Sequence, residues 1–332
     1  MSLVYVSDPR SILSIDGNRL VIKSSDDSIR SLPIELIEGI SLLGPAQLTT
    51  KCMEVCMIRG IPVSFLSKGG RYFGRLMSSG HIRPELQRHQ SALYDTQFAV
   101  GLAKNICTAK IKNQLTVVRR YKKASDGMLN AEISSMRNSI EKIASCKTIA
   151  EITGYEGQAA RSYFSALARC IDPDFVFHGR NRRPPKDPFN SMISLGYSIV
   201  LNEIYSEIEM RGLNPYFGFI HRDSENHPTL ASDLMEEWRA ALIDTSVMAL
   251  INGHEIKKDQ FEYDEDGGCY LQKSAMRIYL NKLEKRFSTR VKYFLYTNNS
   301  VDFRYGISLQ VGRLIKAIDM EDPEQYLPLI IR

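Results

Sequence analysis

The sequence predicts an α+β fold in two domains, a small β-rich N-terminal domain at residues 1–90 and a larger all-helical domain at residues 91–332. The chain of 332 residues exceeds the usual size of one domain, so two domains are the default expectation. Short β-rich runs separated by turn residues fill the first part of the chain. From about residue 90 onward, apolar residues recur at helical spacing instead.

The N-terminal domain is predicted from brief β-rich runs at residues 3–6, 12–15, 19–23 and 61–65. The third run has the period of a half-buried strand. Residues 45–59 predict one helix, which ends at the glycine and proline that follow it. Gly69 and Gly70 join the last run to residues 72–77 as a hairpin, because glycine readily adopts positive φ.

The second domain is predicted from helical periodicity. Residues 85–124 predict one long helix, either straight or kinked, that ends near Gly127, because this segment contains no proline after Pro84 and few glycines. Shorter helices are expected at residues 128–146, 160–170, 190–211 and 275–290. The sequence contains no internal repeat and no low-complexity segment.

Two segments concentrate positive charge. The second half of the long helix carries Lys110, Lys112, Arg119, Arg120, Lys122 and Lys123. The segment HGRNRRPPKDPFN at 178–190, whose prolines prevent a regular helix, carries Arg180, Arg182, Arg183 and Lys186. Each segment is either a solvated basic surface or a surface that contacts phosphates. The net charge of +5 permits a polyanionic partner without requiring one.

Features that the sequence lacks argue against several classes of protein, although the absence of a motif does not exclude any of them. The six cysteines form no CxxC pair and are expected to be buried free thiols in a reducing cytoplasm. Because it has no apolar run of about 18 residues and no basic-then-apolar leader, the protein is expected neither to span a membrane nor to be secreted. Phosphate-loop, nucleophile-elbow and HExxH motifs are absent as well.

The segment at 221–244 combines burial with charge. Its apolar stripe of helical period contains Leu234, Met235, Trp238, Ala241 and Leu242. The same helix carries three carboxylates in its first turns, at Asp233, Glu236 and Glu237. Carboxylates at such spacings repel one another unless a cation or a proton intervenes, and a local conflict of this kind often marks a functional site. Thr229 or Ser232 is expected to cap the start of this helix.

Two further residues are candidates for chemistry. If its helix begins nearby, Glu156 shares an apolar face with the helical residues that follow, so it is either a first-turn carboxylate or a carboxylate at the edge of a dry pocket. His221 follows an apolar run and is either a hydrogen-bonded core histidine or a ligand. Glu236 also has a simpler interpretation as a surface ion pair with Arg239, and Asp233 as a capping residue. Several carboxylates with one imidazole suit Mg²⁺ or Mn²⁺ better than a structural Zn²⁺.

Three ordered blocks of the sequence resemble a known family. They are GYEGQAARSYF at 154–164, RRPPKDPFNSMISLGYSIVLNEI at 182–204 and GFIHRDSENHPTLASDLMEEWRAALID at 218–244. Together they resemble the CRISPR-associated integrase of the adaptation module, the Cas-one family. The β-then-α layout extends the resemblance over the whole chain.

The resemblance implies a site and an activity. The metal ligands of the family fall on Glu156, His221 and Glu236, where many relatives carry aspartate at the last position. Asp233 would complete the acidic pocket or bind metal through water. The implied cofactor is Mg²⁺ or Mn²⁺. The implied activity is insertion of short foreign DNA into the CRISPR array, by attack of a 3′-hydroxyl on a repeat-boundary phosphodiester.

The resemblance also implies partners, namely double-stranded or branched DNA, a second copy of the chain, and the second adaptation protein, of the Cas-two family. The basic residues at 180–186 and 110–123 would neutralise phosphates without reading sequence. A metal-free DNA-binding scaffold and a small-molecule metallohydrolase remain as alternative functions. The second of these has no obvious use for the basic loop.

Overall fold

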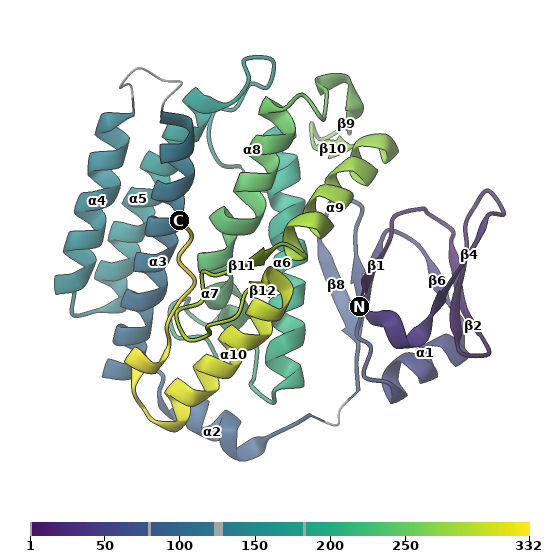
Figure 1. The fold of residues 1–332 in the computed structure, drawn as a ribbon, viewed down its shortest axis with the longest axis horizontal. Helices are drawn as coiled ribbons and strands as arrows, with labels where there is room; N and C mark the ends of the chain where they lie inside the picture. Colours follow the sequence, from purple (N-terminus) through teal and green to yellow (C-terminus); the bar gives the residue numbers. More distant parts are fainter. Residues whose placement is uncertain (1, 79–80, 123–128, 182–183) are drawn as a thin grey trace. The chain divides into compact units, whose positions relative to one another are not determined.

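The computed structural model of the chain describes residues 2–78, 81–122, 129–181 and 184–332. The α+β fold class predicted from the sequence is confirmed, with strands first and helices after them (Figure 1). The chain separates into two compact units, Met1–His81 and Ile82–Arg332. The second unit thus begins before the predicted boundary at residue 90, and two short strand pairs within it depart from the all-helical expectation.

The early boundary follows from the packing of α2 (Pro84–Ala92), which belongs to the second unit. The side chain of Gln90 donates to the backbone carbonyls of Asn214 and Phe217 and accepts from the amide of Asn214. Gln87 donates to the carbonyl of Gly212. These bonds fasten α2 to a loop far along the chain, which local periodicity could not indicate.

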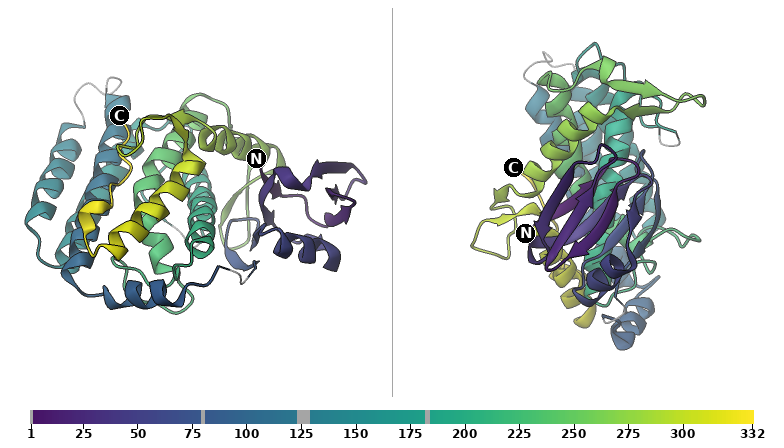
Figure 2. Two further views of the ribbon diagram at one scale, coloured as in Figure 1. Left: turned by 60° about the horizontal axis from the view of Figure 1, so that its bottom comes forward. Right: turned by 90° about the vertical axis from the view of Figure 1, so that its right-hand side faces the viewer.

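In its described residues, the first unit contains two four-stranded sheets, one α-helix and a short 3-10 helix at Ile34–Leu36. One sheet has the order β1-β5-β7-β8, with β1, β5 and β7 parallel and β8 antiparallel: β1 (Ser2–Val6), β5 (Ile37–Leu43), β7 (Val63–Leu66), β8 (Tyr72–Leu76). The other has the order β4-β3-β2-β6: β4 (Ile29–Pro33), β3 (Arg19–Lys23), β2 (Ile12–Asp16), β6 (Gln47–Leu48). The right-hand view of Figure 2 shows strands of this unit side by side, in purple.

Helix α1 (Thr50–Ile58) is shorter than the helix predicted at 45–59. Residues Gln47–Leu48 pair with β2 as a strand, so they are not available to a helix. Thr49 then caps the helix, accepting a hydrogen bond from the amide of Cys52. Cys52 and Cys56 of this helix are buried in a core of aliphatic side chains from both sheets.

The second unit consists mainly of helices. Their bounds are α2 as above, α3 (Gln97–Lys122), α4 (Asn130–Ser145), α5 (Ile149–Cys170), α6 (Pro188–Met210), α7 (Thr229–Trp238), α8 (Thr245–Asn252), α9 (Lys273–Phe287) and α10 (Phe303–Asp319). The short strands pair as β9 (Phe261–Tyr263) with β10 (Cys269–Leu271), and β11 (Arg290–Val291) with β12 (Val301–Asp302). Helices α3, α4 and α5 lie side by side, and α7 packs against α3 and α6 (Figure 1).

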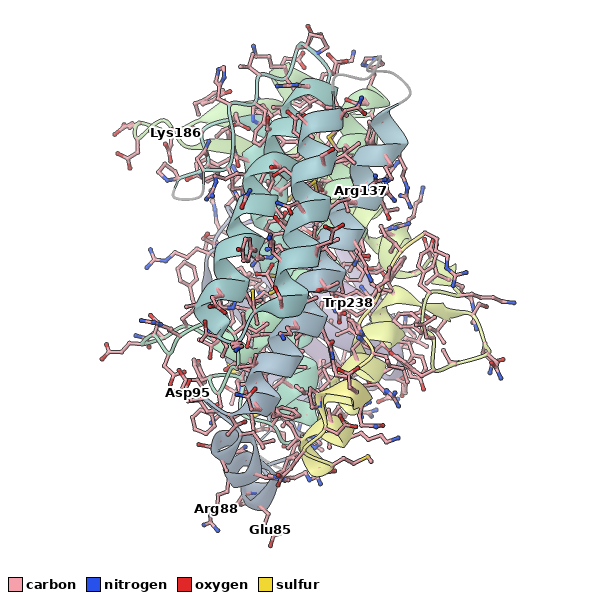
Figure 3. The ribbon with its side chains drawn as sticks, turned by 90° about the vertical axis from the view of Figure 1, so that its left-hand side faces the viewer. Glu85, Arg88, Asp95, Arg137, Lys186 and Trp238 are labelled. Atoms are coloured by element: carbon pink, nitrogen blue, oxygen red, sulfur yellow. The ribbon has the colours of Figure 1, made fainter. Side chains whose placement is uncertain are left out.

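The prediction of a single long helix at 85–124 is wrong, because the helix is interrupted between α2 and α3. Asp95 adopts a positive φ of 56°, which no continuous right-handed helix permits. The hydroxyl of Thr96 donates to the carbonyl of Leu93 across the break. Figure 3 shows Asp95 at this link, at one end of the helices. Aspartate is among the residues that tolerate this conformation best, so neither glycine nor proline was needed.

Helix α7 continues into a π-helical turn at Arg239–Asp244 and then into α8. Every residue of α7 is buried, whereas the apolar stripe in the sequence predicted burial of one face only. Trp238 ends α7 with its ring against those of Phe294 and Phe303, inside the helical unit (Figure 3). In the part of the chain that the structure describes, no helix combines the length and apolar character needed to cross a membrane.

Candidate metal centre

Four elements of the second unit bring charged side chains together. Glu156 comes from α5 and Glu236 from α7, while Lys110 reaches them from α3, which packs against both helices. The Lys110 ammonium donates to Oε1 of Glu156 and lies 2.5 Å from Oε2 of Glu236. His221, on the loop before α7, places Nε2 3.8 Å from Oε1 of Glu236. Two glutamates that lie 80 residues apart in the sequence thus face one ammonium, with the imidazole beside them.

Glu156 lies inside its helix and not in the first turn. Helix α5 begins at Ile149, because Thr148 and Glu151 form a reciprocal capping box there. The helix predicted at 160–170 therefore begins about three turns earlier than predicted. Since the effect of the helix dipole fades beyond the first turn, the first-turn explanation of this carboxylate is wrong. Glu156 is held instead by its ion pair with Lys110.

Asp233 orients His221. Its Oδ2 accepts the backbone amides of Phe219 (2.6 Å) and Ile220 (3.0 Å). Its Oδ1 accepts the amide of His221 and lies 2.6 Å from the ring Nδ1. With Nδ1–H donating to this carboxylate, neutral His221 carries its lone pair on Nε2, the nitrogen that faces Glu236. Asp233 therefore fixes the loop before α7, and does not cap the helix as the simpler interpretation expected.

The loop around His221 approaches α7 so closely that a side chain at Gly218 is excluded. A Cβ atom there would lie 2.8 Å from Oδ2 of Asp233 and from Cβ of Thr229. Thr229 accepts the amide of Gly218 and donates to the carbonyl of Tyr216, so its hydroxyl closes the loop. Neither Thr229 nor Ser232 caps α7 through its side chain, contrary to the prediction.

The charges of this centre shift the pKa values of its members. For His221, the hydrogen bond to Asp233 raises the pKa above its usual range, and burial offsets part of that rise. Burial raises the pKa of Glu236, but the neighbouring cations Arg239 and Lys110 outweigh it and hold that pKa at about 2. Glu236 is therefore an anion at neutral pH, available to a cation.

Arg239 pairs with Glu236 over 3.0 Å, as the spacing of three residues predicted, but the pair is not on the surface. Only 6% of the Glu236 side chain and 16% of that of Arg239 are exposed, because α7 is buried on all sides. The Arg239 guanidinium also stacks over the ring of Tyr197, which Arg180 contacts as well. The pair therefore belongs to the buried centre.

Glu237 points away from Glu236 and binds the C-terminal segment. Its carboxylate accepts from the Tyr326 hydroxyl, the Gln310 amide and the Leu329 backbone amide. Burial raises the pKa of Glu237 to about 7. Glu237 thus lies apart from Asp233 and Glu236, which face the two ring nitrogens of His221. The cations Lys110 and Arg239 compensate the charge of Glu236, as the predicted repulsion between the carboxylates required.

The donor set fits a hard divalent cation. Carboxylate oxygens and one imidazole nitrogen are ligands that Mg²⁺ and Mn²⁺ accept, and Oε2 of Glu236 is buried with the Lys110 ammonium 2.5 Å away from it. Within the described ranges no three histidine, cysteine, aspartate or glutamate side chains are already gathered as a metal-ligand group. The Lys110 ammonium lies instead between the two glutamates.

The basic residues proposed to bind DNA differ in their surroundings. Lys186, which projects from its loop in Figure 3, is exposed, as are Arg119 and Arg120. Arg180 is half-buried and donates to the side chains of Asn190 and Ser194, so part of its guanidinium holds the loop. Outside the described residues lie Arg182, Arg183, Lys123 and the side chain of Lys122. Binding of DNA by this set stays a prediction.

Lys110 is the member of the centre that the sequence interpretation misplaced, since it was grouped with the basic surface. It shares a helical face with the buried residues Ile106 and Val117, four and seven positions away. That spacing was the available signal that this lysine points inward. Arg239 is predicted only as a surface partner, although Met235 and Leu242 of the apolar stripe lie four and three positions away, a spacing that indicates burial.

The family model of CRISPR associated protein Cas1 matches residues 4–285 of the chain. The chain belongs to the Cas1 family. The CRISPR-associated endonuclease Cas1 of Mycobacterium tuberculosis is 33% identical over 333 residues, covering 100% of this chain and 98% of that protein. A Cas4/Cas1 fusion of Geobacter sulfurreducens is 31% identical over 96% of this chain, which spans 59% of the fusion. The resemblance inferred from the three motif blocks is confirmed.

Solved structures agree with this family assignment. A chain of a Cas6-RT-Cas1–Cas2 complex matches with a TM-score of 0.85 and 26% identity, over 98% of this Cas1-family chain and 36% of its own length. A Cas1 protein of Thermotoga maritima matches with a TM-score of 0.80 and 21% identity, over 96% and 97% of the two chains. The second match, at this identity, supports the fold alone.

Proposed function

We propose that this Cas1-family protein is a divalent-metal-dependent DNA endonuclease and integrase of CRISPR adaptation. It would insert short foreign DNA into the CRISPR array by attack of a 3′-hydroxyl on a repeat-boundary phosphodiester. The observation that supports it is that Glu156 and Glu236 face one buried ammonium, with Nε2 of His221 3.8 Å from Oε1 of Glu236. The endonuclease names of relatives that match 100% and 94% of the chain support the same class of reaction.

Glu156, Glu236 and His221 Nε2 would hold the ion, which is Mg²⁺ or Mn²⁺. When bound, such an ion polarises the phosphoryl oxygen and stabilises charge on the attacking and leaving oxygens. Asp233 keeps the imidazole of His221 in the tautomer that presents Nε2. Arg239 stays on Oε1 of Glu236 and fixes that carboxylate.

The exposed cations of the helical unit would hold the DNA backbone. Arg119, Arg120 and Lys186 are exposed, and each can neutralise a phosphate without reading a base. Their contribution would appear as a DNA affinity that falls steeply with salt. The CRISPR array as substrate implies that the protein acts in the cytoplasm.

The proposed partners are DNA, a second copy of the chain and a Cas2 protein. Cas2 is named together with Cas1 in the complex that the chain resembles at 26% identity. A pair of Cas1 chains would place two such centres on one DNA.

The test is Mn²⁺-dependent strand transfer on branched DNA. We expect Glu156→Ala and His221→Ala to lower the rate by at least about 100-fold, because each removes a ligand of the ion. Glu141→Ala and His254→Ala change the same residue types at exposed positions and are expected to keep the full rate. Unchanged rates in both site variants would refute the proposal. DNA binding without turnover under any divalent ion would favour the metal-free scaffold instead.

A further inference from the structure

The Lys110 side chain lies between the two glutamates of the candidate metal centre. Its ammonium donates to Glu156 and is 2.5 Å from Oε2 of Glu236, and only 8% of the side chain is exposed. A buried ammonium is stable only where opposite charges compensate for its lost hydration. In the absence of metal, Lys110 therefore neutralises the two carboxylates that would otherwise repel each other.

We propose that Lys110 and the divalent ion exchange places, with the ammonium holding the two glutamates together until the ion displaces it. This inference rests on the metal-dependent function proposed above. Lys110 would then be a positioning residue, which keeps the ligand set assembled before the ion arrives and sets the affinity for the ion by competing with it.

The ammonium and the ion cannot occupy the centre together. Mg²⁺ takes carboxylate oxygens at about 2.0–2.1 Å, and the ammonium of Lys110 already lies 2.5 Å from the same oxygen of Glu236. Two cations that share one carboxylate oxygen lie close together and repel each other strongly in a buried setting. Binding of the ion therefore requires the ammonium to leave both glutamates, which the flexible four-carbon stem of lysine allows.

The exposed edge of the centre gives the displaced ammonium a route to water. The side chains of Glu156 and His221 are 20% and 38% exposed, whereas that of Glu236 is 6% exposed. We expect Lys110 to turn toward the edge formed by Glu156 and His221. Arg239 contacts Oε1 of Glu236 and not Oε2, so it need not move in the exchange.

Lys110→Met tests the exchange, because methionine keeps an unbranched apolar stem and lacks the charge. We expect this variant to bind Mn²⁺ about tenfold more tightly in calorimetric titration, since the ion no longer displaces an ammonium. In EDTA it is expected to unfold at a lower temperature than the unchanged protein. Addition of Mn²⁺ is expected to raise the unfolding temperature of the variant by more than it raises that of the unchanged protein. Lys112→Met, the same change at an exposed position on α3, is expected to alter neither quantity.

The unchanged protein provides a second measurement should Lys110→Met fail to fold. Lys110 is expected to resist acetylation in EDTA and to react at saturating Mn²⁺, as read by mass spectrometry, while Lys112 reacts in both. Equal or weaker Mn²⁺ affinity in Lys110→Met would overturn the exchange, and so would full protection of Lys110 at saturating Mn²⁺. Absence of Mn²⁺ binding by the unchanged protein would refute the metal centre itself, so the two failures are distinguishable.

Discussion

Asp244→Asn is expected to change how the stability of the protein depends on pH. Asp244 lies at the end of the π-helical turn, 1% exposed, and accepts hydrogen bonds from the hydroxyls of Tyr163 (2.7 Å) and Tyr197 (2.6 Å). Burial raises the pKa of this carboxyl to about 6, and the two tyrosine hydrogen bonds limit that rise. In the unfolded chain the same group titrates near its ordinary value of about 4.

The sign and size of the effect follow from these two pKa values. Because the folded pKa is the higher one, the folded state binds the proton more tightly between about pH 4 and pH 6. The stabilisation is present in full below about pH 4 and is lost as the pH rises through about 6. The difference of about two pKa units between the folded and unfolded states corresponds to about 3 kcal/mol of unfolding free energy. Asparagine does not titrate, so the variant lacks this loss.

Urea unfolding of both proteins at intervals from pH 4 to pH 8 measures the effect. The free energy of unfolding of the unchanged protein minus that of Asp244→Asn is expected to fall by about 3 kcal/mol across this range. Taking the difference removes the contribution of Glu237, whose pKa is also raised. Tyr163→Phe removes a donor to the ionised carboxylate, so it should move the transition to higher pH. A difference that does not vary with pH would refute the reasoning.

Three further changes test the surroundings of the centre. Gly218→Ala should slow strand transfer about tenfold or more, because the new Cβ would lie 2.8 Å from Oδ2 of Asp233. Gly154→Ala in α5 is the control and should keep the rate, because nothing lies within 4 Å of a Cβ at that position. Asp233→Asn should weaken calorimetric Mn²⁺ binding about 10–100-fold by releasing the imidazole, and an unchanged affinity would contradict that role. Asn113→Ala should lower the free energy of unfolding in urea by about 1–3 kcal/mol, because it removes bonds to Glu237 and to the C-terminal segment. Equal stability would show that these bonds contribute nothing.

The fold was predictable where local chemistry decides it. Strand runs and helical periods act over a few residues, so the order of strands and helices could be read from the sequence. The capping box of α5 acts over as few residues, but it did not enter the prediction, which therefore began that helix too late. The break at Asp95 could not, because aspartate enters the left-handed conformation at small cost and helices also contain it. The unit boundary depends on Gln87 and Gln90, whose partners lie more than 120 residues along the chain.

The candidate site was predictable in its residues but not in its arrangement. Motif blocks identified Glu156, His221 and Glu236, and the structure brings them to one place through packing of α3, α5 and α7. That Lys110 lies between the glutamates depends on tertiary packing, although its helical face was visible in the sequence. Glu237 points away from Glu236 because it binds the C-terminal segment, and no local sequence pattern specifies where that segment lies.

The π-helical turn between α7 and α8 sets the angle around the helix axis between Glu236, in the acidic centre, and Asp244, which binds the two tyrosines. At this turn the amide of Thr245 bonds to the carbonyl of Ala240, five residues back, so the turn holds one residue more than an α-helix would. Each helical residue rotates the direction of its side chain by about 100°. Deleting a single residue from Arg239–Asp244 would therefore swing α8 and Asp244 around the axis while leaving Glu236 where it is. Homologous chains that conserve both the acidic pocket and the tyrosine pair are thus constrained in the length of this turn even where its side chains are free to vary.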